Sequence, residues 1–323
     1  MCTAATYHTK DHYFGRTLDV DFPCSQCIAV APRRFPFRFR RVTAPERHHA
    51  LIGMAYVQDG CPLYYDATNE KGLSMAGLNF PENACYHSEE PGMDNVAPYE
   101  LIPWILGRCA TVDEAKWLLD RLNVVDLPFS DTLPVAPLHW MLADGERAVV
   151  VESVAEGLRV YDDPMGVMTN NPPFPYHQLH LNEFMNLTSR PAVNRLSPEL
   201  DLTPYSFGFG AIGLPGDLSS PSRFVRAAFT RANSESGDSE AESVAQFFHI
   251  LGSVAQVRGC ARTAGGCQTT VYTSCCNTDK GIYYYNTYNN FQLTAVDMRR
   301  EELEDDRLVT YPMQTEARVY WQN

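Results

Sequence analysis

The order of strands and helices along this chain predicts an α+β fold built from packed layers. Strand-like segments fill the first eighty residues, a helical stretch follows, and strands and helices then return in blocks. Such blocks are typical of α+β layers, whereas a regular β-α-β alternation would indicate a parallel sheet. Because no repeat or linker divides the 323 residues, we assign residues 1–323 to one domain.

Runs rich in β-branched and aromatic residues, bounded by Gly, Pro, Asn and Asp, predict the strands. Near the N-terminus they cover residues 2–9, 13–18, 28–31, 53–57, 63–65 and 73–78. Further along they cover residues 138–142, 148–151, 158–161, 269–274, 282–285 and 291–296, with a hairpin turn at 141–146. We expect the charged last stretch of the chain to lie on the surface.

Apolar residues at helical spacing predict the helices. They cover residues 98–106, 112–122, 176–188, 222–232 and 241–251. Thr111 is a suitable N-cap for the second helix, because its hydroxyl can accept a hydrogen bond from the first turn. Residues 190–221 are rich in Pro and Gly, and they predict a long ordered loop.

The charge balance argues against nucleic acid as a partner. The formal net charge is −13, which repels phosphate backbones, and the sequence holds no basic arm or stripe. The N-terminal segment lacks the basic and apolar regions of a secretory signal, and no apolar run approaches the roughly 18 residues that a membrane helix needs. We therefore expect a cytoplasmic protein that binds neither nucleic acid nor a membrane.

The ten cysteines include a C-x-x-C motif at Cys24 and Cys27 and an adjacent pair, Cys275 and Cys276. Zinc sites usually show two well-spaced pairs or accompanying histidines, and an adjacent pair fits a tetrahedral site poorly. We interpret these cysteines as small buried hydrophobes and expect no metal. A metal-binding role for the four residues is the alternative.

Cys2 is informative because an initiator methionine is removed when the next residue is small. Removal of Met1 leaves a residue that carries both a thiol and a free α-amine, groups that in unstructured peptides have pKa values near 8.5 and about 7.7–8.0. A base that titrates near neutrality is thus tethered to its nucleophile, and no histidine is needed. On position alone, an early core residue is the simpler interpretation, so the neighbours of Cys2 decide.

Residues 13–19 (YFGRTLD) form a strand that could pair with the first one. In a regular strand Arg16 points to one face while Thr17 and Asp19 point to the other, so a twist or bulge is needed to aim both Arg16 and Asp19 at Cys2. An arginine near a thiol favours the thiolate, and an aspartate near an ammonium can fix its orientation. The alternative is an exposed ion pair, which contributes little.

Several motifs follow one another in a recognisable order. Met1-Cys2-Thr3 and residues 14–19 (FGRTLD) come first. The others are 69–73 (NEKGL), 76–81 (AGLNFP), 138–140 (LHW), 168–172 (MTNNP), 213–217 (GLPGD), 222–224 (SRF) and 281–288 (GIYYYNTY). Together they resemble the choloylglycine hydrolase family, N-terminal-nucleophile hydrolases that include bile salt hydrolases and penicillin V acylases. The resemblance spans nearly the whole chain, and it implies a four-layer αββα sandwich of two antiparallel sheets.

The resemblance also implies the catalytic roles around the N-terminus. Cys2 is the nucleophile, and its own α-amine relays the proton. Arg16 and Asp19 sit around the thiol and the amine. The reaction then runs through a thioester and requires no metal or organic cofactor.

Three further residues take their roles from the resemblance. Asn79 and Asn170 help to hold the oxyanion of the tetrahedral intermediate, and Arg223 orders the charged network beneath the site. Taken singly, each asparagine could be a turn residue before a proline, and Arg223 could be a surface charge at a helix end. Their order along the chain favours the catalytic interpretation.

The substrate implied by the resemblance is a conjugated bile acid. Asn79 resembles the bile salt hydrolase branch, because penicillin V acylases often carry a tyrosine there. By family alignment, the pocket walls are apolar or aromatic, which suits a steroid face, although ordinary core positions are an equal alternative. These walls are Leu18, Leu63, Tyr64, Tyr65 and Leu133.

Other functions stay open at the level of the sequence. They are hydrolysis of penicillin V, hydrolysis of N-acyl homoserine lactones or other fatty amides, and a binding protein that kept the fold without catalysis. The resemblance further implies a homotetramer in which residues 190–221 form the assembly loop.

Overall fold

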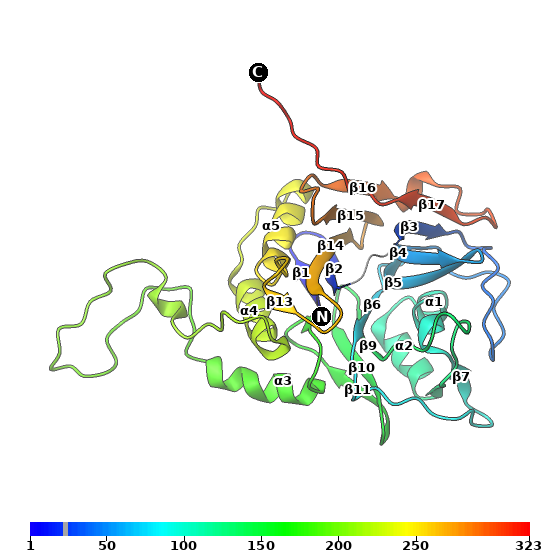
Figure 1. Ribbon diagram of the computed structural model, residues 1–323, viewed down its shortest axis with the longest axis horizontal. Helices are drawn as coiled ribbons and strands as arrows, with labels where there is room; N and C mark the ends of the chain where they lie inside the picture. Colours follow the sequence, from blue (N-terminus) through cyan, green and yellow to red (C-terminus); the bar gives the residue numbers. More distant parts are fainter. Residues whose placement is uncertain (22–24) are drawn as a thin grey trace.

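Two facing β-sheets with helices on both outer sides form the molecule (Figure 1). The structure is a computed structural model, in which residues 1–21 and 25–323 are described. Helices α4 (Ser220–Asn233) and α5 (Glu240–Gly252) cover one sheet, and α1 (Leu101–Leu106) and α2 (Val112–Leu119) cover the other. The predicted α+β class and the αββα order of layers are confirmed.

The first sheet holds the N-terminus at the end of an inner strand. Within the described residues its order is β12-β1-β2-β14-β15-β16, with β13 added beside β14. The strands are β1 (Cys2–His8), β2 (His12–Val20), β12 (Val167–Met168), β13 (Ala261–Arg262), β14 (Cys267–Asn277), β15 (Ile282–Thr287) and β16 (Thr294–Asp297). All paired neighbours in this sheet run antiparallel.

The second sheet has the order β11-β10-β9-β6-β5-β4-β3-β17 in the described part of the chain. Its strands are β3 (Gln26–Ala31), β4 (Leu51–Gln58), β5 (Cys61–Asn69), β6 (Ser74–Asn79), β9 (Leu138–Ala143), β10 (Ala148–Val154), β11 (Gly157–Asp162) and β17 (Val309–Pro312). The sequence did not predict β17, which extends the sheet by pairing with β3. A short parallel pair, β7 (Asp94–Val96) and β8 (Leu122–Val124), was also not predicted.

The helices match the prediction best at their starts. Thr111 is the N-cap of α2, and its hydroxyl accepts a hydrogen bond from the backbone N–H of Glu114 at 3.1 Å. The predicted helix 112–122 is wrong at its end, because α2 stops at Leu119 and β8 follows. The predicted helix 176–188 is wrong in a similar way: α3 (Phe174–His180) passes into a 3₁₀ turn, η2 (Leu181–Phe184). Among the described helices, each is too short or too polar to cross a membrane.

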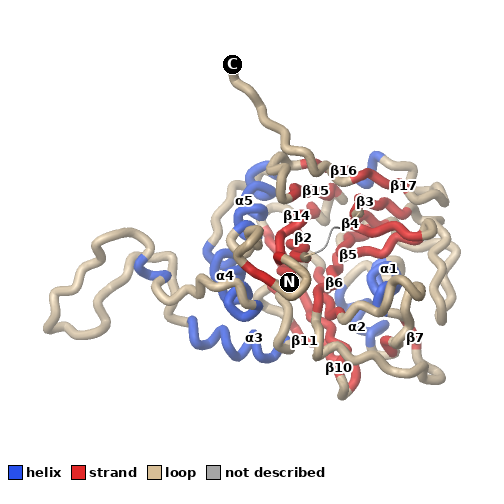
Figure 2. Tube along the Cα trace, in the orientation of Figure 1, coloured by secondary structure: helices blue, strands red, loops and turns tan. Residues whose placement is uncertain are grey.

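The predicted loop at 190–221 is present and projects far from the sheets (Figures 1 and 2). Its only regular pieces in the described chain are a 3₁₀ turn, η3 (Phe209–Ala211), and the first turn of α4, which begins at Ser220. The loop therefore stands apart from both cores.

Two apolar cores separate the layers. The first lies between the sheets and beneath α4 and α5, and it includes Cys2, Leu78 and Phe224. The second lies between the second sheet and helices α1 and α2, with Trp104 and Trp140 fully buried in it. Because side chains alternate along a strand, neighbouring residues of one strand belong to different cores.

Candidate active site

The register of the β1–β2 hairpin decides what surrounds Cys2. Cys2 pairs with Leu18 and Ala4 pairs with Arg16, without a shift along the hairpin. Paired residues share a face, so Cys2, Leu18 and Arg16 all point between the two sheets. The Cys2 side chain is 3% exposed, so the predicted nucleophile begins the strand inside the protein.

Arg16 is completely buried on the same face as Cys2. Its Nη1 donates to the backbone carbonyls of Gly77, at 2.6 Å, and Tyr65, at 3.1 Å, while Nη2 is buried without a hydrogen-bond partner among the described residues. Burial disfavours the charged form, but the Cys2 thiol, Tyr272 and two carboxylates outweigh it and raise the pKa of Arg16. The guanidinium is therefore a fixed positive charge beside the thiol.

Asp19 lies on the opposite face of β2, where its carboxylate accepts hydrogen bonds from the hydroxyls of Thr17, at 3.2 Å, and Thr270, at 2.6 Å. Burial raises the pKa of this carboxyl, against the opposing charges of Arg223, the N-terminus and Arg16. The β1–β2 pairing shows no shift between Arg16 and Asp19, so the two side chains flank the N-terminal segment from opposite faces, and the register shift at this level lies on β14, between Thr270 and Tyr272.

Arg223 joins β1 to the second half of the chain. It sits in the first turns of α4, fully buried, and its Nη1 donates to the carbonyl of Cys2, at 2.6 Å, and the hydroxyl of Thr3, at 2.7 Å. Its Nη2 donates to Oδ1 of Asn170 at 2.8 Å. One guanidinium thus ties the predicted nucleophile to a predicted oxyanion residue.

Asn170 follows β12 and contacts both the N-terminus and Asn79. Its Oδ1 accepts a hydrogen bond from the backbone nitrogen of Cys2 at 2.7 Å, and its Nδ2 donates to the carbonyl of Asn79 at 2.7 Å. The side chain of Asn79, at the end of β6, is exposed. The structure therefore brings the predicted asparagines together beside Cys2.

Met1 is present in the chain and is held in place. Its nitrogen donates to the carbonyl of Asp19 and to Oε1 of Gln268, both at 2.7 Å, and its carbonyl accepts from the N–H of Asp19 at 3.0 Å. While Met1 remains, the nitrogen of Cys2 belongs to a peptide bond and cannot act as a base. The contacts of Asn170 and Arg223 with Cys2 are present while Met1 remains.

The predicted pocket walls divide between the two cores. Leu18 lies on the face of Cys2, and Tyr65 packs partly buried against the same core. Tyr64 does not join them: its ring is buried in the second core, and its hydroxyl donates to the carbonyl of Ala29 at 3.4 Å. Leu63 is half-buried in β5, and Leu133 is half-buried in the loop before β9.

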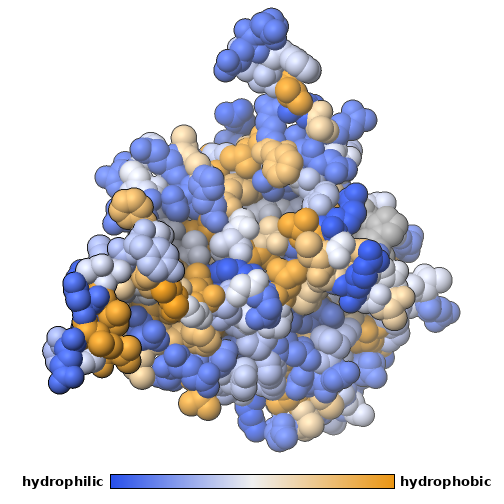
Figure 3. All heavy atoms as spheres, turned by 60° about the vertical axis from the view of Figure 1, so that its left-hand side comes forward, coloured by the Kyte–Doolittle hydropathy of each residue, from blue (hydrophilic) through white to orange (hydrophobic). Residues whose placement is uncertain are grey.

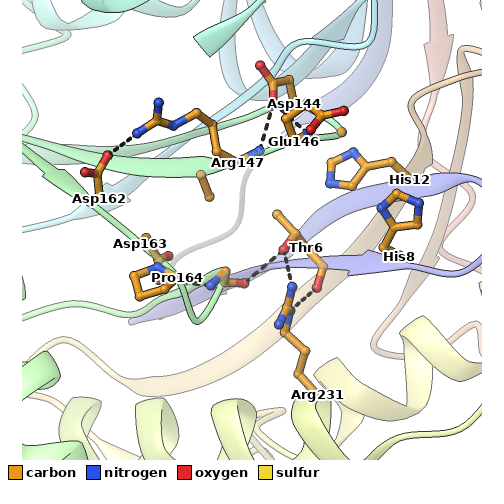
Figure 4. A pocket seen from close by; sticks show the side chains of 13 residues that line it. Thr6, His8, His12, Asp144, Glu146, Arg147, Asp162, Asp163, Pro164 and Arg231 are labelled. Carbon is orange, nitrogen blue, oxygen red and sulfur yellow. Dashed lines mark hydrogen bonds and ion pairs between the residues drawn. The ribbon is translucent and has the colours of Figure 1, made fainter. Parts of the chain in front are cut away.

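A cavity of about 410 Å³ opens along the same side of β2. Val20 lines it, two residues from Leu18 and on the same face, together with Val271, Tyr288 and Met313. A larger hollow of about 440 Å³ lies near the β1–β2 turn, around His12, at the far end of the hairpin (Figure 4). At about 3.3 Å per residue, that turn is roughly 20 Å from Cys2. The six predicted catalytic residues, all described, line neither cavity.

The cysteine cluster considered for a metal is only partly described. Cys24 lies outside the described residues, while Cys275 and Cys276 are buried in β14. Among residues 1–21 and 25–323, no group of three or more His, Cys, Asp or Glu side chains could hold a metal ion.

Comparison with known proteins decides the family. The family described as "Linear amide C-N hydrolases, choloylglycine hydrolase family" matches residues 2–311. The chain belongs to this family. It is accordingly a hydrolase of linear amides.

Curated relatives cover almost the whole chain. It is 48% identical to the "Bile salt hydrolase/transferase" of Lactiplantibacillus plantarum over 321 residues, which is 99% of each protein. It is 39% identical to the "Bile salt hydrolase/transferase" of Clostridium perfringens, with 96% of each protein covered.

Solved structures agree with the fold. The C2A mutant of conjugated bile acid hydrolase from Clostridium perfringens superimposes with a TM-score of 0.91 at 37% identity, covering 100% of both chains. Penicillin V acylase from Agrobacterium tumefaciens superimposes with a TM-score of 0.73 at 19% identity, over 96% of this chain and 90% of that one. The second likeness concerns the fold alone.

Sequence reasoning missed the buried polar groups behind this candidate site. His139, in the LHW motif of the resemblance, hydrogen bonds to Glu152 on the next strand, and His177 of α3 reaches the carbonyl of Asn170. Asp66, on β5, accepts hydrogen bonds from three hydroxyls of the first sheet. Polar residues within otherwise apolar strands were the available signal, since such groups are retained where they have partners.

Proposed function

We propose that this chain hydrolyses the amide bond of glycine- or taurine-conjugated bile acids, with the sulfur of Cys2 as the nucleophile once Met1 is removed. The observation that carries the proposal is the hydrogen bond from the nitrogen of Cys2 to Asn170, which Arg223 also binds. Loss of Met1 turns that nitrogen into an amine already held beside the thiol. Relatives with bile salt hydrolase in their names, at 39–48% identity, support the choice of substrate.

The free amine of Cys2 supplies the proton relay. It takes the thiol proton as the sulfur attacks the substrate carbonyl, and the positive charge of Arg16 favours the thiolate. It then gives that proton to the leaving nitrogen, so the C–N bond breaks and the acyl group stays on sulfur as a thioester. A water that loses its proton to the same amine attacks the thioester and releases the acid.

Two asparagines provide donors for the oxyanion. Asn170 commits one hydrogen of Nδ2 to the carbonyl of Asn79 and keeps the second for the substrate. The exposed side chain of Asn79 is the second proposed donor. By analogy with other oxyanion holes, each donor is worth about 2.7–4 kcal/mol in the transition state.

An apolar wall beside Cys2 supports a steroid as the acyl part. Leu18 and Val20 follow one another on its face of β2, and Val20 opens into the cavity of about 410 Å³. That volume lies within the range of pockets that take small organic ligands. Tyr65 extends the wall from the second sheet.

The substrate test is a side-by-side assay of the purified protein on glycocholate, taurocholate and penicillin V. We expect release of glycine or taurine, and none from the Cys2→Ala variant. Turnover of penicillin V without release from either bile salt would overturn the substrate and move the assignment to a penicillin acylase.

Removal of Met1 is tested with an N-terminal extension. A tagged chain that begins before Met1 should be inactive, and site-specific cleavage that leaves Cys2 as the first residue should restore activity, with mass spectrometry reading the terminus. Equal activity before and after cleavage would contradict the role of the amine.

We further propose a homotetramer in the cytoplasm. Large apolar side chains on the projecting loop and the segment before it are exposed, among them Met185, Tyr205 and Phe207. The loop lies on the left-hand side of Figure 1, which is turned forward in Figure 3. Exposed apolar groups gathered in this way favour burial against another subunit. A reducing cytosol keeps a nucleophilic thiol such as Cys2 active.

A further inference from the structure

We propose that His139, paired with Glu152, is a positioning residue that holds the two candidate oxyanion asparagines in register. The proposal rests on the proposed function and concerns the same site. His139 lies on β9 of the second sheet, 1% exposed, and Glu152 lies on the adjacent strand β10, 0% exposed.

His139 touches the neighbour of each asparagine. Its Nε2 donates to the carbonyl of Thr169, at 2.9 Å, directly before Asn170. Its ring stacks on Phe80, directly after Asn79, with ring centres 4.2 Å apart and planes 3° from parallel. One imidazole therefore lies under both segments that meet in the hydrogen bond between Asn170 and Asn79.

The positions of their hydrogens join His139 and Glu152 into one hydrogen-bonded pair. Nε2 faces a carbonyl and must carry a hydrogen, while Nδ1 lies 3.1 Å from Oε1 of Glu152, so a second hydrogen is shared there. Whichever partner holds it, the His139–Glu152 pair is neutral overall, which lowers the cost of burying it. Loss of either partner leaves the other with a buried group that has lost its hydrogen bond.

Glu152 also fixes the chain after Asn170. Its Oε1 accepts the backbone N–H of Phe174 at 3.0 Å, at the start of α3. Three residues further on, Nε2 of His177 donates to the carbonyl of Asn170 at 2.9 Å. The segment that carries Asn170 is thus held from both sides by buried polar groups.

These contacts separate two functions of the site. The side chain of Arg16 donates to the carbonyls of Thr17, Tyr65 and Gly77, and two of the four hydrogen bonds of Arg223 go to Cys2 and Thr3. Those of His139 go to the side of the oxyanion. Asn170 also accepts the hydrogen bond from the nitrogen of Cys2, so loss of His139 should weaken stabilisation of the oxyanion more than it changes the reactivity of the Cys2 thiol, for which Arg16 and the contacts of Arg223 with Cys2 and Thr3 remain.

The test uses His139→Gln and Glu152→Gln in the full chain, with Met1 removal checked by mass spectrometry. Because a displacement of about 1 Å can cost about 100-fold in rate, we expect kcat on glycocholate to fall about 10- to 100-fold in each variant. KM should stay within about threefold, since a contact made only in the transition state changes kcat. Alkylation of Cys2 by iodoacetamide should stay within about twofold of the wild-type rate, because this reaction forms no oxyanion.

His48→Gln is the matched control. His48 is also buried, its ring nitrogens lie 2.7 and 2.9 Å from the carbonyls of His49 and Phe35, and its ring lies 4.7 Å from that of Phe37. It packs away from Cys2, beside the second core, so its variant should keep the wild-type kcat. If His139→Gln does not fold, Glu152→Gln carries the same comparison.

The proposal is overturned if kcat is unchanged in Glu152→Gln, or if kcat and the alkylation rate fall together. A wild type that releases no glycine or taurine overturns the proposed substrate instead. The His139 comparison then runs on whichever linear amide the wild type hydrolyses, because every such amide forms an oxyanion.

Discussion

Buried charge is the main feature of single residues around Cys2. Arg16 and Arg223 are both 0% exposed, and two carboxyls, Asp19 and Asp66, are buried with them. Burial raises the pKa of Asp66, while Arg16 and the hydroxyls of neighbouring tyrosines and Ser274 oppose that rise. Buried charges of opposite sign offset part of the free-energy cost of removing each other from water. Truncating one of these side chains should therefore lower the free energy of unfolding by more than the pair contributes to it.

A histidine far from Cys2 gives a prediction for pH. Burial and, to a smaller extent, the charge of His8 lower the pKa of His12 to about 4, while the negative charges of Asp279 and Asp144 oppose this shift. Between pH 6.5 and 4, His12 binds a proton in the unfolded chain, where its pKa is about 6.5, but not in the folded chain. The free energy of unfolding therefore has its full value above pH 6.5 and falls as the pH is lowered toward 4. Wild type should lose about 1.4 kcal/mol per pH unit more than His12→Gln across that range.

Urea unfolding at a series of pH values measures this difference. His249→Gln, on the exposed face of α5, is the control and should keep the wild-type profile. Parallel profiles for the wild type and His12→Gln would show that His12 titrates alike in the folded and unfolded chains.

In the first sheet, strands β2 and β14 approach each other closely at Gly15. Gly15, on β2, lies against the backbone of β14, where an added Cβ would collide with the carbonyl of Ser274. The register of these strands shifts between Thr270 and Tyr272, so the irregularity near the site lies on β14 and leaves β2 straight. The regular hairpin that presents Cys2 and Arg16 therefore depends on a glycine one residue before Arg16.

Gly15→Ala tests this packing. We expect a loss of about 2 kcal/mol or more in unfolding free energy, because a backbone atom must move to make room. Gly145→Ala, in the β9–β10 turn, would meet no heavy atom within 4 Å and is the matched control. A thermal or urea melt compares the two, and equal stability would contradict the close approach.

Elements that depend on neighbouring residues could be predicted from the sequence, whereas elements that depend on pairing with distant strands could not. The N-cap at Thr111 and the hairpin before β10 depend on a few neighbouring residues, and both were found. Strand β17 becomes a strand by pairing with β3, some 280 residues earlier, for which the sequence carries no local sign. Likewise, α2 ends at Leu119 because β8 needs the next residues for its pairing with β7.

Some residues of the candidate site could likewise be predicted from the sequence, and others could not. Motif order located Cys2, Arg16, Asn170 and Arg223, and the structure brings them together. A bulge in β5, opposite Met54 and Ala55, interrupts the alternation of its side chains, so Tyr64 lies in the other core. No spacing along the chain could pair His139 with Glu152 across two strands.

The projecting loop dominates the shape of the whole molecule. Phe207 is 103% exposed and Tyr205 is 91% exposed, far more than a folded core allows. The loop leaves the body after α3 and returns at α4, whose Arg223 reaches the carbonyl of Cys2. Assembly through the loop would therefore act on the helix that holds the site.

Light scattering tests the assembly. The wild type should have four times the chain mass of 36.3 kDa, and the double variant Tyr205→Ser/Phe207→Ser should shift toward smaller species. Trp117→Ser, another strongly exposed aromatic, on α2, is the control and should keep the wild-type mass. A wild type with the mass of one chain would end the tetramer proposal.

One of the hydrogen bonds that hold Met1 in place forms late in synthesis. The nitrogen of Met1 donates to Gln268, 267 residues away, so this bond cannot form until most of the chain has left the ribosome. At about 5–20 residues per second, the N-terminus stays free of that contact for roughly 10–50 s. An aminopeptidase that works on emerging chains meets Met1 in that interval. On the proposed mechanism, a chain that folds before Met1 is removed would lack the free amine of Cys2 and would not hydrolyse its substrate.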